Sequence, residues 1–155
     1  MSTHRLSLAA AFACAAALIP SSALAAGKTE TFRFFSQPQA LVITHADGTV
    51  VDHPPYPQAK PGDTLDIYAV DYEGTHARHA KTPFASEHLV CRFGDAPEPD
   101  CVSHVALGSS LLIFSGSPGT VTGGAGRYFG ATGRVLSNKE VEGGSDVVAR
   151  VTRRG

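Results

Sequence analysis

The chain has 155 residues, 17% of them charged, and a formal net charge of −1, with no block of like charge. This balance offers no electrostatic footprint for a nucleic acid or an anionic membrane surface, and both are excluded as expected partners. The length fits a single domain with a core of its own, and it leaves no room for a second domain once an N-terminal export signal is removed.

Residues 1–25 have the three parts of a secretory signal peptide. A basic stretch ends at Arg5, an apolar run follows to Pro20, and small residues then surround Ala25. The apolar run is about 15 residues long, whereas a membrane-spanning helix needs roughly 20. We therefore expect cleavage after Ala25, with Ala26 as the second choice. The mature protein would be one soluble domain, residues 26–155, in a secreted or periplasmic location with no membrane partner.

The three cysteines divide between the signal and the mature domain. A lipid anchor on Cys14 is the alternative to simple cleavage, but the bulky Phe12 and the apolar run beyond the cysteine do not fit one. Cys91 and Cys101 remain as a pair in an oxidising compartment, which favours a disulfide. The alternative is two buried free thiols that pack as small apolar side chains.

Helical periodicity is hard to find after Ala26, while Gly, Pro, Asn and Asp interrupt the chain at short intervals. This pattern predicts an all-β fold of about eight strands, and a sequential meander closes most simply into a barrel without exposed edges. The candidate strands are Thr31–Phe35, Ala40–His45, Thr64–Tyr72, Ser86–Phe93, Cys101–Leu107, Leu111–Ser115, Gly119–Thr122, Tyr128–Val135 and Asp146–Thr152.

Apolar residues alternate along the central strands, as expected for a sheet with two unlike faces. In Ser86–Phe93 one face carries Leu89, Cys91 and Phe93. Cys101 shares its parity with Val105 in the next strand. Both cysteines can therefore point to the same apolar side, which supports the disulfide.

The glycine-rich stretch 123–133 invites comparison with phosphate-binding loops. The spacing after Gly126 is one residue too long for G-x-G-x-x-G, and neither Lys-Ser, Lys-Thr nor a helix follows. We expect the glycines to occupy positive-φ positions in turns and bulges, with Tyr128 and Phe129 packing on opposite faces.

This stretch resembles the glycine-rich signature of the allene oxide cyclase and dirigent barrels, over Val121–Val135. Upstream, Gly62–Gly74 is similar to a strand of the cyclases, and Cys91 falls near a cysteine that lines the cyclase cavity. The resemblance implies an eight-stranded antiparallel barrel, often a homotrimer, with an apolar lumen for a small organic molecule. It covers most of residues 62–135 and is weak before Gly62.

By the matched register, one face of two strands would point into this lumen. These residues are Leu65, Ile67, Ala69, Glu87, Leu89, Cys91 and Phe93. Ala69 stands where the cyclases have an asparagine, and Ala40–Ala46 lacks their early glutamate, so the allene oxide reaction itself is not expected. Glu87 is the catalytic candidate, because a carboxylate inside an apolar barrel can act as a general acid or base. The alternative is a Glu87 that lies in water at the barrel mouth.

Histidines are the other residues that could carry chemistry. His76 and His79 form a His-x-x-His pair, with His88 close behind, but no Cys or carboxylate lies at a characteristic offset. We therefore expect solvated histidines and no metal site. No G-x-S-x-G motif supports a hydrolase.

These observations favour an exported barrel that binds a small apolar molecule and directs its cyclisation or stereochemistry by shape, without a cofactor. Two alternatives stay open. One is a non-catalytic carrier, and the other is a structural module whose barrel is filled by its own side chains.

Overall fold

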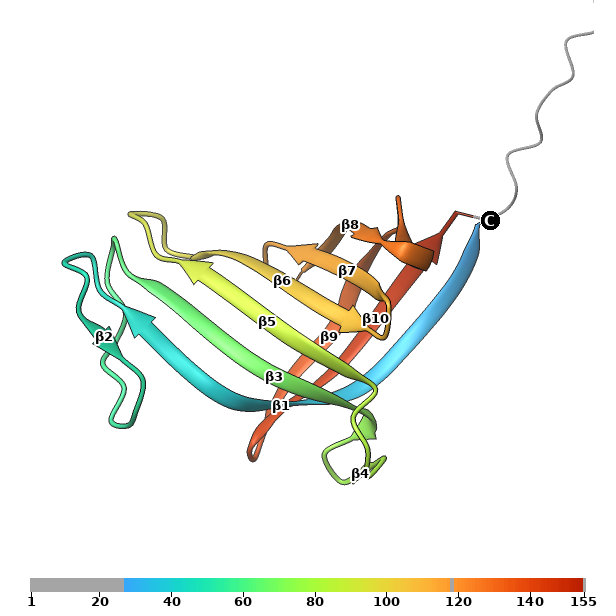
Figure 1. Cartoon of the computed structure of the whole chain (residues 1–155), viewed down its shortest axis with the longest axis horizontal. Coiled ribbons are helices and arrows are strands. Elements are labelled where there is room, and N and C mark those ends of the chain that lie inside the picture. The colour runs from blue at the N-terminus through green and yellow to red at the C-terminus, as the bar shows by residue number, and fades with distance from the viewer. Residues whose placement is uncertain (1–26, 118, 155) are drawn as a thin grey trace, which may run out of the picture.

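The computed structural model describes residues 27–117 and 119–154, which form a closed antiparallel β-barrel (Figure 1). The eight barrel strands are β1 (Lys28–Thr44), β3 (Thr64–Thr75), β5 (Ala85–Arg92), β6 (Asp100–Leu107), β7 (Ser110–Ser115), β8 (Thr120–Ala125), β9 (Thr132–Val141) and β10 (Gly144–Arg153). Two-residue strands β2 (Val50–Val51) and β4 (Arg78–His79) extend the sheet, and a 3-10 turn, η1 (Gly126–Tyr128), precedes β9. The predicted all-β, eight-stranded barrel is confirmed.

The predicted signal peptide, residues 1–25, and Cys14 lie outside the described residues. Residues 27–117 and 119–154 contain no helix that is long and apolar enough to cross a membrane. The first and last described strands run side by side, with Lys28 opposite Arg153, so the two ends of the domain lie together (Figure 1).

Strand β1 closes the barrel because it is long enough to pair with two neighbours. Its first half pairs with β10 and its second half pairs with β3. The prediction of two separate strands, Thr31–Phe35 and Ala40–His45, was therefore wrong. The ladder instead shifts register between Pro38 and Ala40. A bulge at this point accommodates a proline that has no N–H to donate.

Strands β5 and β6 carry the predicted disulfide. Cys91 lies directly opposite Cys101 in the register, and their sulfur atoms are bonded. The bond therefore closes the connection 93–99 at its base, and the prediction is confirmed.

Residues 126–131 of the glycine-rich stretch form the turn between β8 and β9, and its ends belong to those two strands. Gly126 has φ +62° and Gly130 has φ +68°, as expected for turn glycines. Tyr128 is fully buried whereas Phe129 is 74% exposed, so the two rings do point to opposite sides. The predicted strand Tyr128–Val135 was wrong at its start, because residues 126–128 form η1 and the strand begins only at Thr132.

The meander gives the barrel two ends with different connections (Figure 1). The connections after β1, β5, β7 and β9 lie at one end, which we call the cavity end. Those after β3, β6 and β8 lie at the opposite end together with both termini of the domain, and we call it the closed end.

Asp63 anchors the long connection 45–63 at the cavity end. Its carboxylate accepts hydrogen bonds from the backbone N–H of Lys60 at 2.8 Å and of Ala46 at 3.1 Å, and it contacts Nδ1 of His45 at 3.0 Å. The Lys60 hydrogen bond is the largest influence that holds the pKa of Asp63 below its ordinary value. The ionised carboxylate thus ties both ends of this connection together.

Candidate functional site

The barrel encloses a cavity of about 320 Å³ on its inner face. Most of its wall is apolar, and Phe34, Ile67, Leu89 and Phe114 supply large side chains to it. Polar groups come from Glu87 and from serine and asparagine side chains such as Ser103 and Asn138. The volume lies at the lower end of the range for small-molecule sites, about 300–1,000 Å³.

The cavity occupies only the cavity end because side chains fill the other end. Leu107, Leu112, Ala131 and Val151 are buried there around the ring of Tyr128. The cavity itself reaches the turn after β7, where Ser117 lines it. A ligand would therefore enter from the cavity end.

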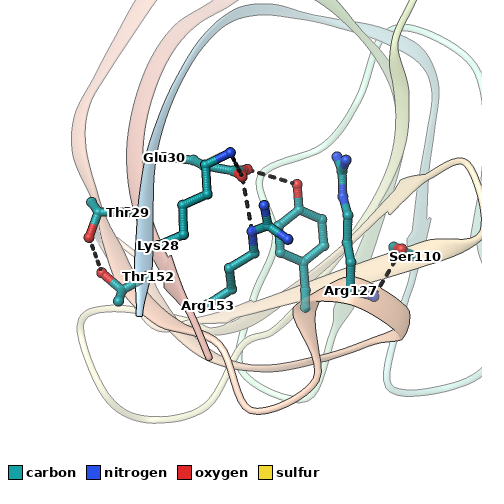
Figure 2. A network of polar contacts seen from close by, with 8 residues as sticks. Lys28, Thr29, Glu30, Ser110, Arg127, Thr152 and Arg153 are labelled. Atoms are coloured by element: carbon teal, nitrogen blue, oxygen red, sulfur yellow. Dashed lines mark hydrogen bonds and ion pairs between the residues drawn. The ribbon is translucent and has the colours of Figure 1, made fainter. Parts of the chain in front are cut away.

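A polar network secures the closed end (Figure 2). Glu30 accepts hydrogen bonds from Nε of Arg153 at 3.0 Å and from the Tyr128 hydroxyl at 3.4 Å. The Arg127 guanidinium lies 4.7 Å from the centre of the Tyr128 ring. The phenol hydroxyl thus has a partner although the residue is buried, so Tyr128 can act as a plug at this end.

Glu87 is held on the cavity wall by two hydroxyl groups. Ser103 Oγ, on the facing strand β6, donates to Oε1 at 2.5 Å, and Ser36 Oγ, on β1, donates to Oε2 at 3.1 Å. Each carboxylate oxygen therefore has one protein donor and further lone pairs for a ligand. The arrangement fixes the position of the carboxylate, as a general acid or base or an anchoring acceptor requires.

A second carboxyl group, Asp71, lies beside Glu87. Asp71 is opposite Ser36 in the register and shares the inward parity of Ile67 and Ala69. It is fully buried, and neither carboxylate oxygen has a hydrogen-bond partner.

Burial and then the nearby charge of Glu87 raise the pKa of Asp71 to about 7. The Ser36 hydroxyl lowers this pKa in part, although its hydrogen is donated to Glu87. Near neutral pH, Asp71 therefore exists as a mixture of neutral and ionised forms next to Glu87.

The structure brings part of the predicted lumen set together. Ile67, Ala69 and Leu89 line the cavity with Glu87, whereas Leu65, Cys91 and Phe93 are not among its lining residues. Cys101 lines it in place of its disulfide partner. Sequence reasoning missed Asp71, although extending the alternation Leu65, Ile67, Ala69 by one step reaches it.

The histidines considered as metal ligands lie away from the cavity. His88 Nε2 contacts Asp66 at 2.8 Å, and its ring stacks on exposed Tyr68 with centroids 4.4 Å apart. His76 and His79 pack against Phe35. Across the described part of the chain, no group of three or more His, Cys, Asp or Glu is placed to hold a metal ion.

Comparison with solved structures finds this fold in a demethylase and in dirigent proteins. A pyocyanin demethylase matches with a TM-score of 0.53 and 13% identity, covering 79% of this chain and 98% of its own. One pterocarpan synthase dirigent protein matches with a TM-score of 0.54 and 14% identity, covering 99% of this chain and 100% of its own. A second matches with a TM-score of 0.50 and 14% identity, covering 83% of this chain and 97% of its own.

These likenesses show that the chain has the barrel fold of dirigent proteins, as the sequence resemblance implied. No family model matches the sequence. No curated protein matches it either.

Proposed function

We propose that this protein binds a small, largely apolar organic molecule inside its barrel and directs the cyclisation or stereochemistry of that molecule without a cofactor. In this proposal the mature domain is exported and works as a soluble barrel. Glu87 is the group that exchanges a proton with the bound molecule.

The observation that carries the proposal is the cavity itself. It is an apolar space of about 320 Å³ that contains one charged side chain, Glu87, held by Ser36 and Ser103. Apolar walls with a few fixed polar groups are typical of sites that bind and orient small organic molecules. Confinement of a flexible molecule in one reactive conformer can supply several kcal/mol of a reaction barrier.

The structural neighbours support the same proposal. Barrels of this fold include a pyocyanin demethylase and pterocarpan synthases, which are named for reactions of small organic molecules. The carboxyl group of Glu87 on the cavity wall, with the buried Asp71 beside it, supports a role in proton transfer.

Cavity binding can be tested with N-phenyl-1-naphthylamine, a neutral probe that fluoresces in apolar surroundings. Ala69 lines the cavity, whereas Ala77 is exposed on the connection 76–84. We expect saturable binding to the wild type, a loss of at least about tenfold in affinity for Ala69→Phe because the larger side chain fills the cavity, and unchanged affinity for Ala77→Phe. No binding, or equal binding by both variants, would contradict the proposal.

The chemical role is tested with the molecule that remains bound after purification under native conditions, identified by mass spectrometry. Glu87→Gln should slow its conversion by about 10²-fold or more, measured at concentrations of the molecule that saturate both proteins. Release of an unchanged molecule by the wild type would instead identify a carrier.

A further inference from the structure

The connections at the cavity end are acidic. They carry Asp47, Asp52, Asp63, Asp95, Glu98 and Glu142, against one basic residue, Lys60. Part of this charge is already partnered, since Asp63 is bound as described and Asp52 contacts Nδ1 of His53 at 2.9 Å. Asp95 and Glu98 are exposed on the connection between β5 and β6.

The connections at the closed end have the opposite sign. They carry Arg78, Lys81 and Arg127, and Arg154 follows β10 there. No acidic residue lies in these connections within the described part of the chain. The connections of the barrel are therefore polarised along its axis, with negative charge at the end where the cavity opens and positive charge at the plugged end, where Glu30 of β1 offsets part of it by pairing with Arg153.

The interior has the same sign as the cavity end. Among its described lining residues, the cavity has no Lys, Arg or His, and its one charged side chain is Glu87. Asp71, two residues further along β3 than Ala69, is fully buried and without a hydrogen-bond partner, and it adds a second carboxyl group beside Glu87. Buried carboxyl groups without a partner favour either a proton or a nearby positive charge.

We propose that the ligand of this cavity is an organic cation, an apolar ring system or chain that carries one positive charge and places it against Glu87. This inference rests on the proposed function. A cation pairs with a carboxylate already fixed by Ser36 and Ser103, so little reorganisation opposes the pairing. The negative potential of the acidic connections raises the local concentration of cations at the entrance and disfavours anions.

The ionisation of Asp71 then couples affinity to pH. The residues that face Asp71 across the sheet are Ser36 on β1 and Ala85 on β5, with Glu87 one step further along β5. Glu87 is the one titratable side chain among these facing residues, and its charge raises the pKa of Asp71. Loss of the Asp71 proton gives the site a second negative charge, so a bound cation favours the ionised form and its affinity should rise with pH through about 7.

Three probes of one shape test the charge preference: 1-methylquinolinium, neutral 1-methylnaphthalene and anionic 1-naphthoate. Their dissociation constants are measured by displacement of N-phenyl-1-naphthylamine at pH 6 and pH 8. We expect the cation to bind about ten- to a hundredfold more tightly than the neutral probe, and the anion to bind more weakly than both. The preference for the cation should also increase between pH 6 and pH 8.

Two variants assign this preference to the carboxyl groups. Glu87→Gln should remove most of the preference for 1-methylquinolinium, while its unchanged affinity for 1-methylnaphthalene shows that the cavity is intact. Asp71→Asn should leave the preference at pH 6 and abolish its increase at pH 8. If the cation binds no more tightly than the neutral probe, the charge inference is overturned but the proposed binding function stands. If neither the three probes nor N-phenyl-1-naphthylamine bind, both are overturned.

Discussion

Asp71 offers a direct test of whether the barrel interior forces a carboxyl group to remain neutral. Burial and the charge of Glu87 raise its pKa from 3.8 to about 7 in the folded protein. Below about pH 3 the carboxyl group is protonated in both the folded and the unfolded chain, so ionisation costs the fold nothing. Above that pH the unfolded chain ionises first, and stability falls as pH rises until the folded pKa is passed.

The size of the effect follows from the two pKa values. A rise from 3.8 to about 7 corresponds to about 4 kcal/mol of destabilisation at pH 8, at about 1.4 kcal/mol per pH unit. About 2 kcal/mol of this is already present at pH 5, where the unfolded chain alone is ionised. Asp71→Asn removes the ionisation but keeps the shape of the side chain. Its stability relative to the wild type should therefore increase by about 2–3 kcal/mol between pH 5 and pH 8.

Urea unfolding with the disulfide intact measures this difference. The chain has 4 tyrosines and no tryptophan, so tyrosine fluorescence and circular dichroism serve as the probes. Asp95→Asn, on an exposed connection, is the matched control and should show no pH-dependent gain. If the stability of Asp71→Asn relative to the wild type is the same at both pH values, then Asp71 ionises freely in the fold and the argument for a strained interior carboxyl is wrong.

Two further predictions concern the framework that holds the cavity. Replacing both Cys91 and Cys101 with Ser should lower the free energy of unfolding by about 2–3 kcal/mol. Alkylation of the non-reduced wild type should label neither cysteine, and labelling of both would show that the bond does not form. Gly133→Ala places a Cβ 2.1 Å from the carbonyl oxygen of Arg150 at φ +154°, so it should destabilise by at least about 2 kcal/mol in the same unfolding assay. Gly94→Ala, whose Cβ would meet open space, is its control and should change stability little.

Alternation of apolar and polar residues was sufficient to predict most of the barrel. The predicted strand Ser86–Phe93 and the observed β5, Ala85–Arg92, differ by one residue at each end, and the parity of Cys91 and Cys101 correctly indicated the disulfide. Such strands have one buried face, so a slip of one residue would expose the whole apolar set. Their position in the sequence is therefore strongly determined.

The errors occurred where backbone irregularity outweighed the local pattern. Pro38 lacks an N–H and lies in the gap between the predicted strands Thr31–Phe35 and Ala40–His45, but the ladder shifts register next to it in a bulge and β1 continues. Tyr128 and Phe129 alternate like strand residues, yet the glycines around them form a turn that inserts Tyr128 into the closed end of the barrel. Neither arrangement can be inferred from a period of two, because each depends on contacts with strands that are distant in the sequence.

The candidate site shows the same division between local and distant information. Glu87 was selected because the register of the family resemblance places it in the lumen, and Asp71 could have been found by extending the parity of Leu65, Ile67 and Ala69. The two serines that hold Glu87 could not, since Ser36 and Ser103 come from strands β1 and β6 that only barrel closure brings together.

The charge polarity of the barrel is the part of the site that the linear sequence conceals most completely. No block of like charge exists, because the acidic connections 45–63, 93–99 and 142–143 are separated by strands and by basic connections such as 76–84. An up-and-down meander sends alternate connections to opposite ends, so charges that alternate along the chain become segregated in space. A balanced net charge therefore argues against a uniformly charged partner, but it is compatible with a strongly negative entrance to the barrel. The proposed preference for cations depends on this local negative charge.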